Sequence, residues 1–115
     1  MAKTASPRTS FITLTLNADQ GTRILRNSQL GEIIISLLLP IKIDDAKKAQ
    51  LQAELNAGKQ YLNAPKLRSD IVDELLLRPL AWLEKEAPVE ERISKKVSNY
   101  LGWLRSDGVL QPTSR

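Results

Sequence analysis

The chain has 115 residues, of which 42% are hydrophobic and 26% charged, with a formal net charge of +4, values typical of one globular domain. It contains no cysteine and no histidine, which excludes disulfides, thiolate or imidazole metal sites, thiol nucleophiles and histidine acid–base catalysis. The absence of cysteine fits a reducing compartment, and we expect a cytoplasmic protein. The most apolar segment, Ile33–Leu39, is interrupted by Ser36 and is far shorter than the ~20 residues that cross a bilayer, so no membrane is expected.

The N-terminal segment is predicted to be extended. Residues 1–9 read as a flexible arm, followed by one helical domain over residues 10–110 and a flexible tail over residues 111–115. Apolar and polar residues alternate from Ser10 to Leu16, which is typical of a short strand. One strand cannot form a sheet, so this segment is expected to lie on helices or to pair with another chain, including by self-association.

Two helix starts are predicted between residues 17 and 39. Asn17 followed by Gln20 matches a helix N-cap with a reciprocal partner, and Ser28 can cap a second helix. A glycine in each segment weakens both predictions. The run Ile33–Leu39 is compatible with a buried strand or with a helix; its helical neighbours favour the helix.

The helical signal becomes stronger from residue 44 onward. Asp44 and Asp45 are expected at the positive end of a helix that stops at Asn63–Pro65. Ser69 or Asp70 caps the next helix, which Pro79 should kink or restart.

The last helix is predicted to run from Pro88 to Ser106, with Gly108 as the glycine that follows its end. Together these elements predict a mainly all-α fold, a bundle of four to five helices with a short N-terminal extended segment.

The last helix carries two distinct rows of side chains. At 100° per residue, its core face comprises Val89, Ile93, Val97, Tyr100 and Leu104. A second row on its flank comprises Arg92, Lys96, Asn99 and Trp103. Cations neutralise phosphates, an amide can bond a base edge, and an indole can stack on a base. This row is therefore a candidate nucleic-acid surface, and an ordinary amphipathic flank is the alternative.

The segment from Ser94 to Leu110 resembles the recognition helix and following strand of winged-helix proteins. The residues that carry the resemblance are Val97-Ser98, Leu101, Leu104 and Gly108-Val109-Leu110. It implies a helix that enters a DNA groove. The segment before it departs from that pattern, because Ala87-Pro88 and Glu90-Glu91 stand where the short first helix and tight turn belong.

Further charged clusters have both functional and structural interpretations. Lys59, Lys66 and Arg68 form a basic patch around the Asn63–Pro65 turn, and Arg23 and Arg26 form another short basic spot. Both could extend a phosphate-binding surface if the fold gathers them with Arg92 and Lys96. Three carboxylates, those of Asp70, Asp73 and Glu74, could hold a hard cation, but acids in a first helical turn are better explained by the helix dipole. With no catalytic or nucleotide-binding motif, we expect no enzyme activity, no metal and no cofactor.

Two functions are consistent with these patterns. The first is a small basic helical protein that binds DNA or RNA through its last helix, without catalysis. The second is a protein-interaction adapter or a subunit of a larger complex. In its small, basic, all-helical architecture the chain is similar to the small subunits of CRISPR effector complexes, which implies packing along a nucleoprotein filament.

Overall fold

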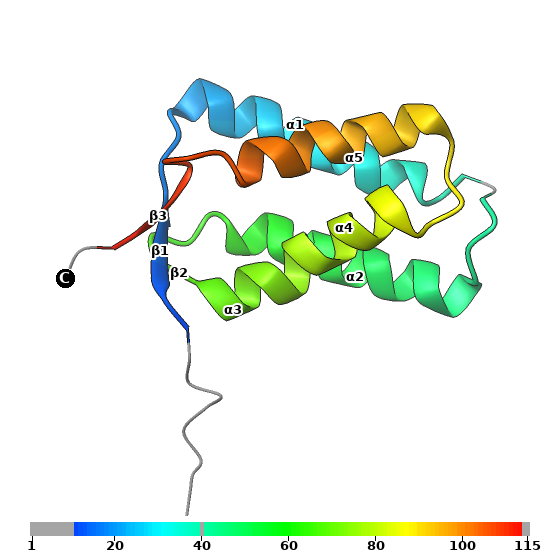
Figure 1. The fold of residues 1–115 in the computed structure, drawn as a ribbon, viewed down its shortest axis with the longest axis horizontal. Helices are drawn as coiled ribbons and strands as arrows, with labels where there is room; N and C mark the ends of the chain where they lie inside the picture. The colour runs from blue at the N-terminus through cyan, green and yellow to red at the C-terminus, as the bar shows by residue number, and fades with distance from the viewer. Residues whose placement is uncertain (1–10, 40, 114–115) are drawn as a thin grey trace, which may run out of the picture.

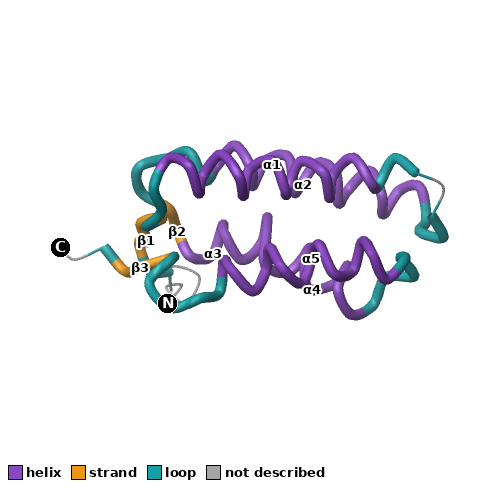
Figure 2. Tube along the Cα trace, turned by 90° about the horizontal axis from the view of Figure 1, so that it is seen from above, coloured by secondary structure: helices purple, strands orange, loops and turns teal. Residues whose placement is uncertain are grey.

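The computed structural model describes residues 11–39 and 41–113, most of which are helical. The elements in chain order are β1 (Thr13–Leu16), α1 (Gln20–Ser36), α2 (Asp45–Tyr61), β2 (Leu67–Arg68), α3 (Ser69–Val72), the π-helical turn η2 (Asp73–Leu77), α4 (Arg78–Lys85), α5 (Glu91–Leu104) and β3 (Leu110–Pro112). The helices lie in two layers, α1 with α2 and α3–α4 with α5, and the strands gather at one end (Figures 1 and 2).

The expected N-terminal strand is confirmed for Thr13–Leu16, and it lies at the centre of a small sheet. The strand order is β2-β1-β3, with both neighbours antiparallel to β1. Leu14 pairs with Leu67 on one side and with Pro112 on the other. The partners of β1 therefore come from the same chain. This corrects the expectation that Ser10–Leu16 offers a strand for self-association; Ser10 itself and residues 1–9 lie outside the described residues.

The chain end also differs from the sequence-based expectation. Gln111 and Pro112, assigned to a tail that begins at residue 111, lie in β3, and the Thr113 N–H donates to the Thr13 carbonyl. Gly108 has a positive φ of 85°, a conformation that glycine adopts without strain, and it lies in the turn that leads from α5 to β3. Residues 114 and 115 lie outside the described residues.

Helix α1 is one continuous helix of 17 residues, so the predicted second start at Ser28 was wrong. Its N-cap is Asp19, not Asn17, and the Asp19 Oδ1 accepts a hydrogen bond from the Thr22 N–H at 2.7 Å. The run from Ile33 is helical through Ser36. Leu30 and Ile33 are fully buried, and this packing offsets the cost of a glycine in the helix interior.

Replacing Asp19 by alanine is expected to lower the melting temperature, whereas asparagine should preserve the cap. Hydrogen bonds from Thr22 hold the pKa of the Asp19 carboxyl below its usual value, because they favour the charged form. A lowered folded-state pKa stabilises the fold above the unfolded-state pKa of about 3.9, and the gain is lost as the pH falls through the folded-state value.

Melting curves of the wild type and Asp19→Asn, followed by circular dichroism from pH 7 to pH 2, test this. Below about pH 4, the melting temperature of the wild type should fall relative to that of the asparagine variant. A difference between the two proteins that is constant with pH would contradict the assignment.

Helix α2 begins at the predicted place. Asp44 is its N-cap, and its Oδ2 accepts from the Ala46 N–H at 3.1 Å. The helix ends at Tyr61, just before the predicted stop at Asn63–Pro65.

Helices α3 and α4 are joined by η2 into one uninterrupted helical path, so Pro79 does not begin a separate helix. In a regular α-helix residue 79 would donate to the Leu75 carbonyl, but proline has no N–H. The helix widens just before this point, where the Arg78 N–H donates to the Asp73 carbonyl, five residues back. The freed Leu75 carbonyl lies against Gly58 of α2, only 3.2 Å from where a Cβ at Gly58 would stand.

Helix α5 begins at Glu91, three residues later than the predicted start at Pro88, because Glu90 is extended (ψ 151°). Its expected core face is confirmed: Ile93, Val97, Tyr100 and Leu104 are buried, and Val89 is half-buried in the preceding loop. The core they join comprises Leu16, Leu30, Ile33, Leu37, Ile43, Leu51, Leu55, Leu62, Leu67, Val72, Leu76, Leu80, Leu83 and Leu101.

Candidate functional site

The predicted row on α5 faces the neighbouring helix α1. Arg92, Lys96 and Asn99 are exposed and line a groove between the two helices. The groove also contains Leu25 and Glu32 of α1. The structure thus brings three of the four predicted residues to one surface feature.

The two cations of this row each have a carboxylate partner. Arg92 Nη2 lies 3.3 Å from Glu90 Oε1, and Lys96 Nζ lies 3.0 Å from Glu32 Oε1. The row alone is therefore not a strongly positive surface. Both pairs are largely exposed to water, and such pairs contribute little stability, so a phosphate can compete for the cations.

Trp103, the fourth residue of the row, is half-buried at the other end of α5. The Tyr100 ring centroid is 5.6 Å from that of Trp103, and the Arg26 guanidinium lies over the indole at 5.1 Å from its centroid. The indole is thus held between α5 and α1, with part of its surface still accessible.

The second predicted group, Lys59, Lys66 and Arg68, is not joined to this groove. Lys59 lies near the end of α2 beside Gly31 of α1, and Lys66 is exposed in the turn before β2. Arg68 is paired with Asp70 at 2.8 Å and stacks over Phe11 at 4.1 Å from the ring centroid. Since β2 and the start of α5 lie at opposite ends of the molecule, Arg68 and Arg92 do not form one surface (Figure 1).

Two arginines of α1 face the interior; the sequence marked them only as a short basic spot and not as part of the predicted row on α5. The buried residues of α1, Leu30 and Ile33, and Leu37 just after it repeat every three to four positions. Continued toward the N-terminus, that spacing places Arg26 and Arg23 on the same inward side of the helix. Both are half-buried. Positions where a leucine would normally pack thus carry positive charges.

These arginines have different roles in the structure. Arg23 donates to the Ala18 carbonyl from Nε at 2.9 Å and to the Leu16 carbonyl from Nη2 at 2.7 Å, which ties the end of β1 to α1. Arg26 donates from Nη1 to Gln29 at 2.9 Å, but its buried Nε has no hydrogen-bond partner among the described residues. A buried donor without an acceptor is costly, and it is uncommon in a folded protein.

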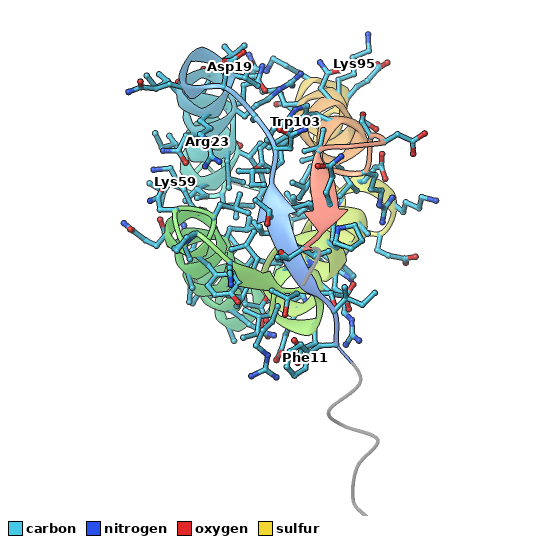
Figure 3. The ribbon with its side chains drawn as sticks, turned by 90° about the vertical axis from the view of Figure 1, so that its left-hand side faces the viewer. Phe11, Asp19, Arg23, Lys59, Lys95 and Trp103 are labelled. Atoms are coloured by element: carbon cyan, nitrogen blue, oxygen red, sulfur yellow. The ribbon has the colours of Figure 1, made fainter. Side chains whose placement is uncertain are left out.

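Arg23, Arg26 and Trp103 line a pocket of about 240 Å³ at the end that carries the sheet. The remaining lining residues are Leu16, Gln20, Ile24, Asn27, Leu62, Asn63 and Tyr100. Figure 3 looks onto this end, with Arg23 on α1 and Trp103 on α5. The lining contains two guanidinium groups, three amides and an indole, but no carboxylate. It is suited to an anion attached to a flat ring.

The Tyr100 hydroxyl adds a neutral group to this pocket. Burial raises the pKa of Tyr100 well above its usual value of about 10, although the positive charge of Arg26 acts in the opposite direction. The phenol therefore keeps its proton at physiological pH. It can serve as a hydrogen-bond donor to an anion, but it does not supply a base for catalysis.

The acidic residues considered for a cation serve other interactions. Asp70 pairs with Arg68, and Asp73 lies 2.7 Å from Arg78. Within residues 11–39 and 41–113, no group of three or more acidic side chains is arranged to hold a metal ion, and no helix has the length and apolar character needed to cross a bilayer.

Comparisons with known proteins give no further guide to the site, because no family model, curated protein or solved structure matches this chain. The functional argument therefore depends on the geometry of the arginine pocket and of the groove between α1 and α5.

Proposed function

We propose that this protein binds single-stranded nucleic acid without catalysis, with α1 and α5 forming the contact surface of an antiparallel helical bundle. The observation that carries the proposal is the arginine pocket, in which two arginines free of carboxylate partners among the described residues lie beside Trp103. Guanidinium groups suit phosphate, and an indole offers a stacking face for a base.

The size of the pocket favours a single strand. A space of about 240 Å³ is comparable to one nucleotide and is too small for a duplex. A base that enters it must be unstacked from its neighbours, which is inexpensive only in single strands. The strand would continue along the groove, where Asn99 can contact a base edge and Arg92 and Lys96 exchange their carboxylates for phosphates.

The same proposal assigns no catalytic reaction to the pocket. The pocket has no carboxylate, and the chain has no histidine or cysteine to act as a base or nucleophile. A chain without cysteine is also suited to a reducing compartment, so we place this activity in the cytoplasm.

Arg26→Gln is expected to weaken binding of a fluorescein-labelled 12-nucleotide single strand by about 10-fold or more, because a charge-assisted hydrogen bond contributes about 1.5–3 kcal/mol. Fluorescence anisotropy at 50 mM and 200 mM KCl provides the measurement. If two to three phosphates are neutralised, wild-type affinity should fall about 10-fold between these salt concentrations.

The matched control is Arg78→Gln, since Arg78 is 76% exposed on α4, paired with Asp73, and does not line the pocket. It should bind like the wild type. In a Trp82→Phe background, Trp103 is the remaining tryptophan, so its emission should change when the strand binds. Absence of binding at 50 mM KCl, or equal affinity of the wild type and Arg26→Gln, would refute the proposal.

A further inference from the structure

The arginine pocket is closed toward the interior of the protein. Leu16, Leu62 and Tyr100 belong to its lining and are also buried core residues. A strand therefore cannot pass through the pocket into the molecule. The part of a ligand that enters must fit within about 240 Å³.

The pocket adjoins one end of the groove between α1 and α5. Arg26 lines the pocket, and its Nη1 donates at 2.9 Å to Gln29, which lines the groove. From there the groove follows α5 from Asn99 toward Arg92, away from the end that carries the sheet (Figure 1). A strand that lies in the groove can thus place its terminal nucleotide in the pocket.

The charge of the pocket matches a terminal phosphate better than an internal one. Its two guanidinium groups carry two positive charges, and no residue of its lining is acidic. A phosphodiester within a strand carries one negative charge. A terminal phosphate monoester carries about 1.5–2 near pH 7, because its second pKa is about 6, and positive neighbours favour its doubly charged form.

The hydrogen-bond donors of the pocket favour the same ligand. A guanidinium group has five N–H donors. Among the described residues, hydrogen bonds use two N–H groups of Arg23 and one of Arg26, so both side chains keep donors for a ligand. Asn27 and Asn63 add amide donors to the lining. A terminal phosphate offers three unesterified oxygens to these donors, one more than a phosphodiester.

We propose that the arginine pocket holds the terminal phosphate of the bound strand, with the adjoining base against Trp103. The inference rests on the proposed function, since the rest of the strand lies along the groove. A 5′-phosphate and a 3′-phosphate share this chemistry, and the one that binds sets the direction in which the strand runs from the pocket toward Arg92. The protein thereby distinguishes the end of a strand from its interior.

Three 12-nucleotide strands of one sequence, each with fluorescein on an internal base, test the inference by anisotropy at 50 mM KCl. One strand has a 5′-phosphate, one a 3′-phosphate, and one has hydroxyl groups at both ends. One phosphorylated strand should bind about 10-fold tighter than the hydroxyl strand, the effect of at least one additional charge-assisted hydrogen bond. The other phosphorylated strand should bind like the hydroxyl strand.

Arg26→Gln removes one of the two charges, so it should reduce this preference from about 10-fold to about 2-fold or less. Lys96→Gln is the matched control, because Lys96 lines the groove and not the pocket. It should weaken binding of all three strands by the same factor and keep the preference. Melting curves of both variants show whether they are folded.

The preference should also depend on pH in a way that a purely structural role of Arg26 does not explain. The charged groups of the pocket lining are Arg23 and Arg26, and Tyr100 keeps its proton. The phosphate is therefore the group in the occupied pocket that titrates near pH 6. Between about pH 7.5 and 5.5 the free phosphate takes up a proton and loses its second charge, so the preference should shrink.

Equal affinity of the three strands, at a level that is still measurable, would overturn this inference and leave the proposed function intact. Equal tightening by the 5′-phosphate and the 3′-phosphate would also overturn it, because that result reflects added charge and not a pocket for one end. Absence of binding by any of the strands would instead contradict the proposed function itself.

Discussion

Ile33→Ala is expected to lower the free energy of unfolding by about 2–5 kcal/mol, the cost of removing a large apolar side chain from a packed core. Ile33 is fully buried on the inner side of α1, whereas Ile35, two residues later, is 62% exposed. The same substitution at Ile35 should change stability by no more than about 0.5 kcal/mol. The two variants thus compare the stability contributions of the buried and the exposed face of α1.

Urea unfolding followed by circular dichroism measures both effects. The midpoint should fall for Ile33→Ala with an unchanged slope, and it should hardly move for Ile35→Ala. Equal losses for the two variants would show that α1 is rotated relative to the core described here.

Gly58→Ala is expected to destabilise the protein, although alanine favours helices. A Cβ at this position would lie 2.6 Å from side-chain carbons of the fully buried Leu76 and 3.2 Å from the Leu75 carbonyl. Overpacking costs about 1–3 kcal/mol, which exceeds the gain of about 1 kcal/mol from replacing a helical glycine. Neither neighbour can yield easily, since one is in the core and the other is backbone.

Gly102→Ala is the control for Gly58→Ala, because nothing lies within 4 Å of its Cβ position in α5. It should raise stability by up to about 1 kcal/mol. The double variant Gly58→Ala/Leu76→Ala should be more stable than the sum of the single losses predicts, because the new methyl group occupies part of the space that leucine leaves. Thermal unfolding of the five proteins tests these signs, and stabilisation by Gly58→Ala would contradict the close approach of α2 to η2.

Helices whose apolar repeat persists over several turns, or whose N-cap residue lies directly before them in the sequence, could be predicted. The inner face of α5 was identified correctly because its apolar residues keep helical spacing over several turns. The start of α2 followed from Asp44, whose side chain accepts from N–H groups only two and three residues away. Both signals are contained within a short segment.

Elements that depend on distant residues were not predicted. Strands β2 and β3 have two and three residues, too few to show a period, and they exist because β1 lies between them. The carboxylate partner of Lys96 comes from α1, 64 residues away. A row of cations read from one helix therefore looked more positive than the folded surface is.

The arginine pocket escaped prediction for a different reason. Helical periodicity is normally read from apolar residues, and here the inward stripe of α1 begins with Arg23 and Arg26. The signal was nevertheless present, since the spacing of Leu30, Ile33 and Leu37 leads back to both positions. Charged residues on an otherwise buried stripe are worth noting as candidate sites.

The central place of β1 also constrains when the fold can be completed. Its partners in β3 come close to a hundred residues later, and the Thr15 and Thr113 hydroxyls that meet across the sheet are 98 positions apart. Closing so long a loop costs about 4 kcal/mol of chain entropy before any contact compensates. Contacts between helices adjacent in the chain span shorter separations and can form earlier. During synthesis β1 therefore leaves the ribosome long before β3, and its edge toward β3 stays unpaired until Leu110–Pro112 have been made.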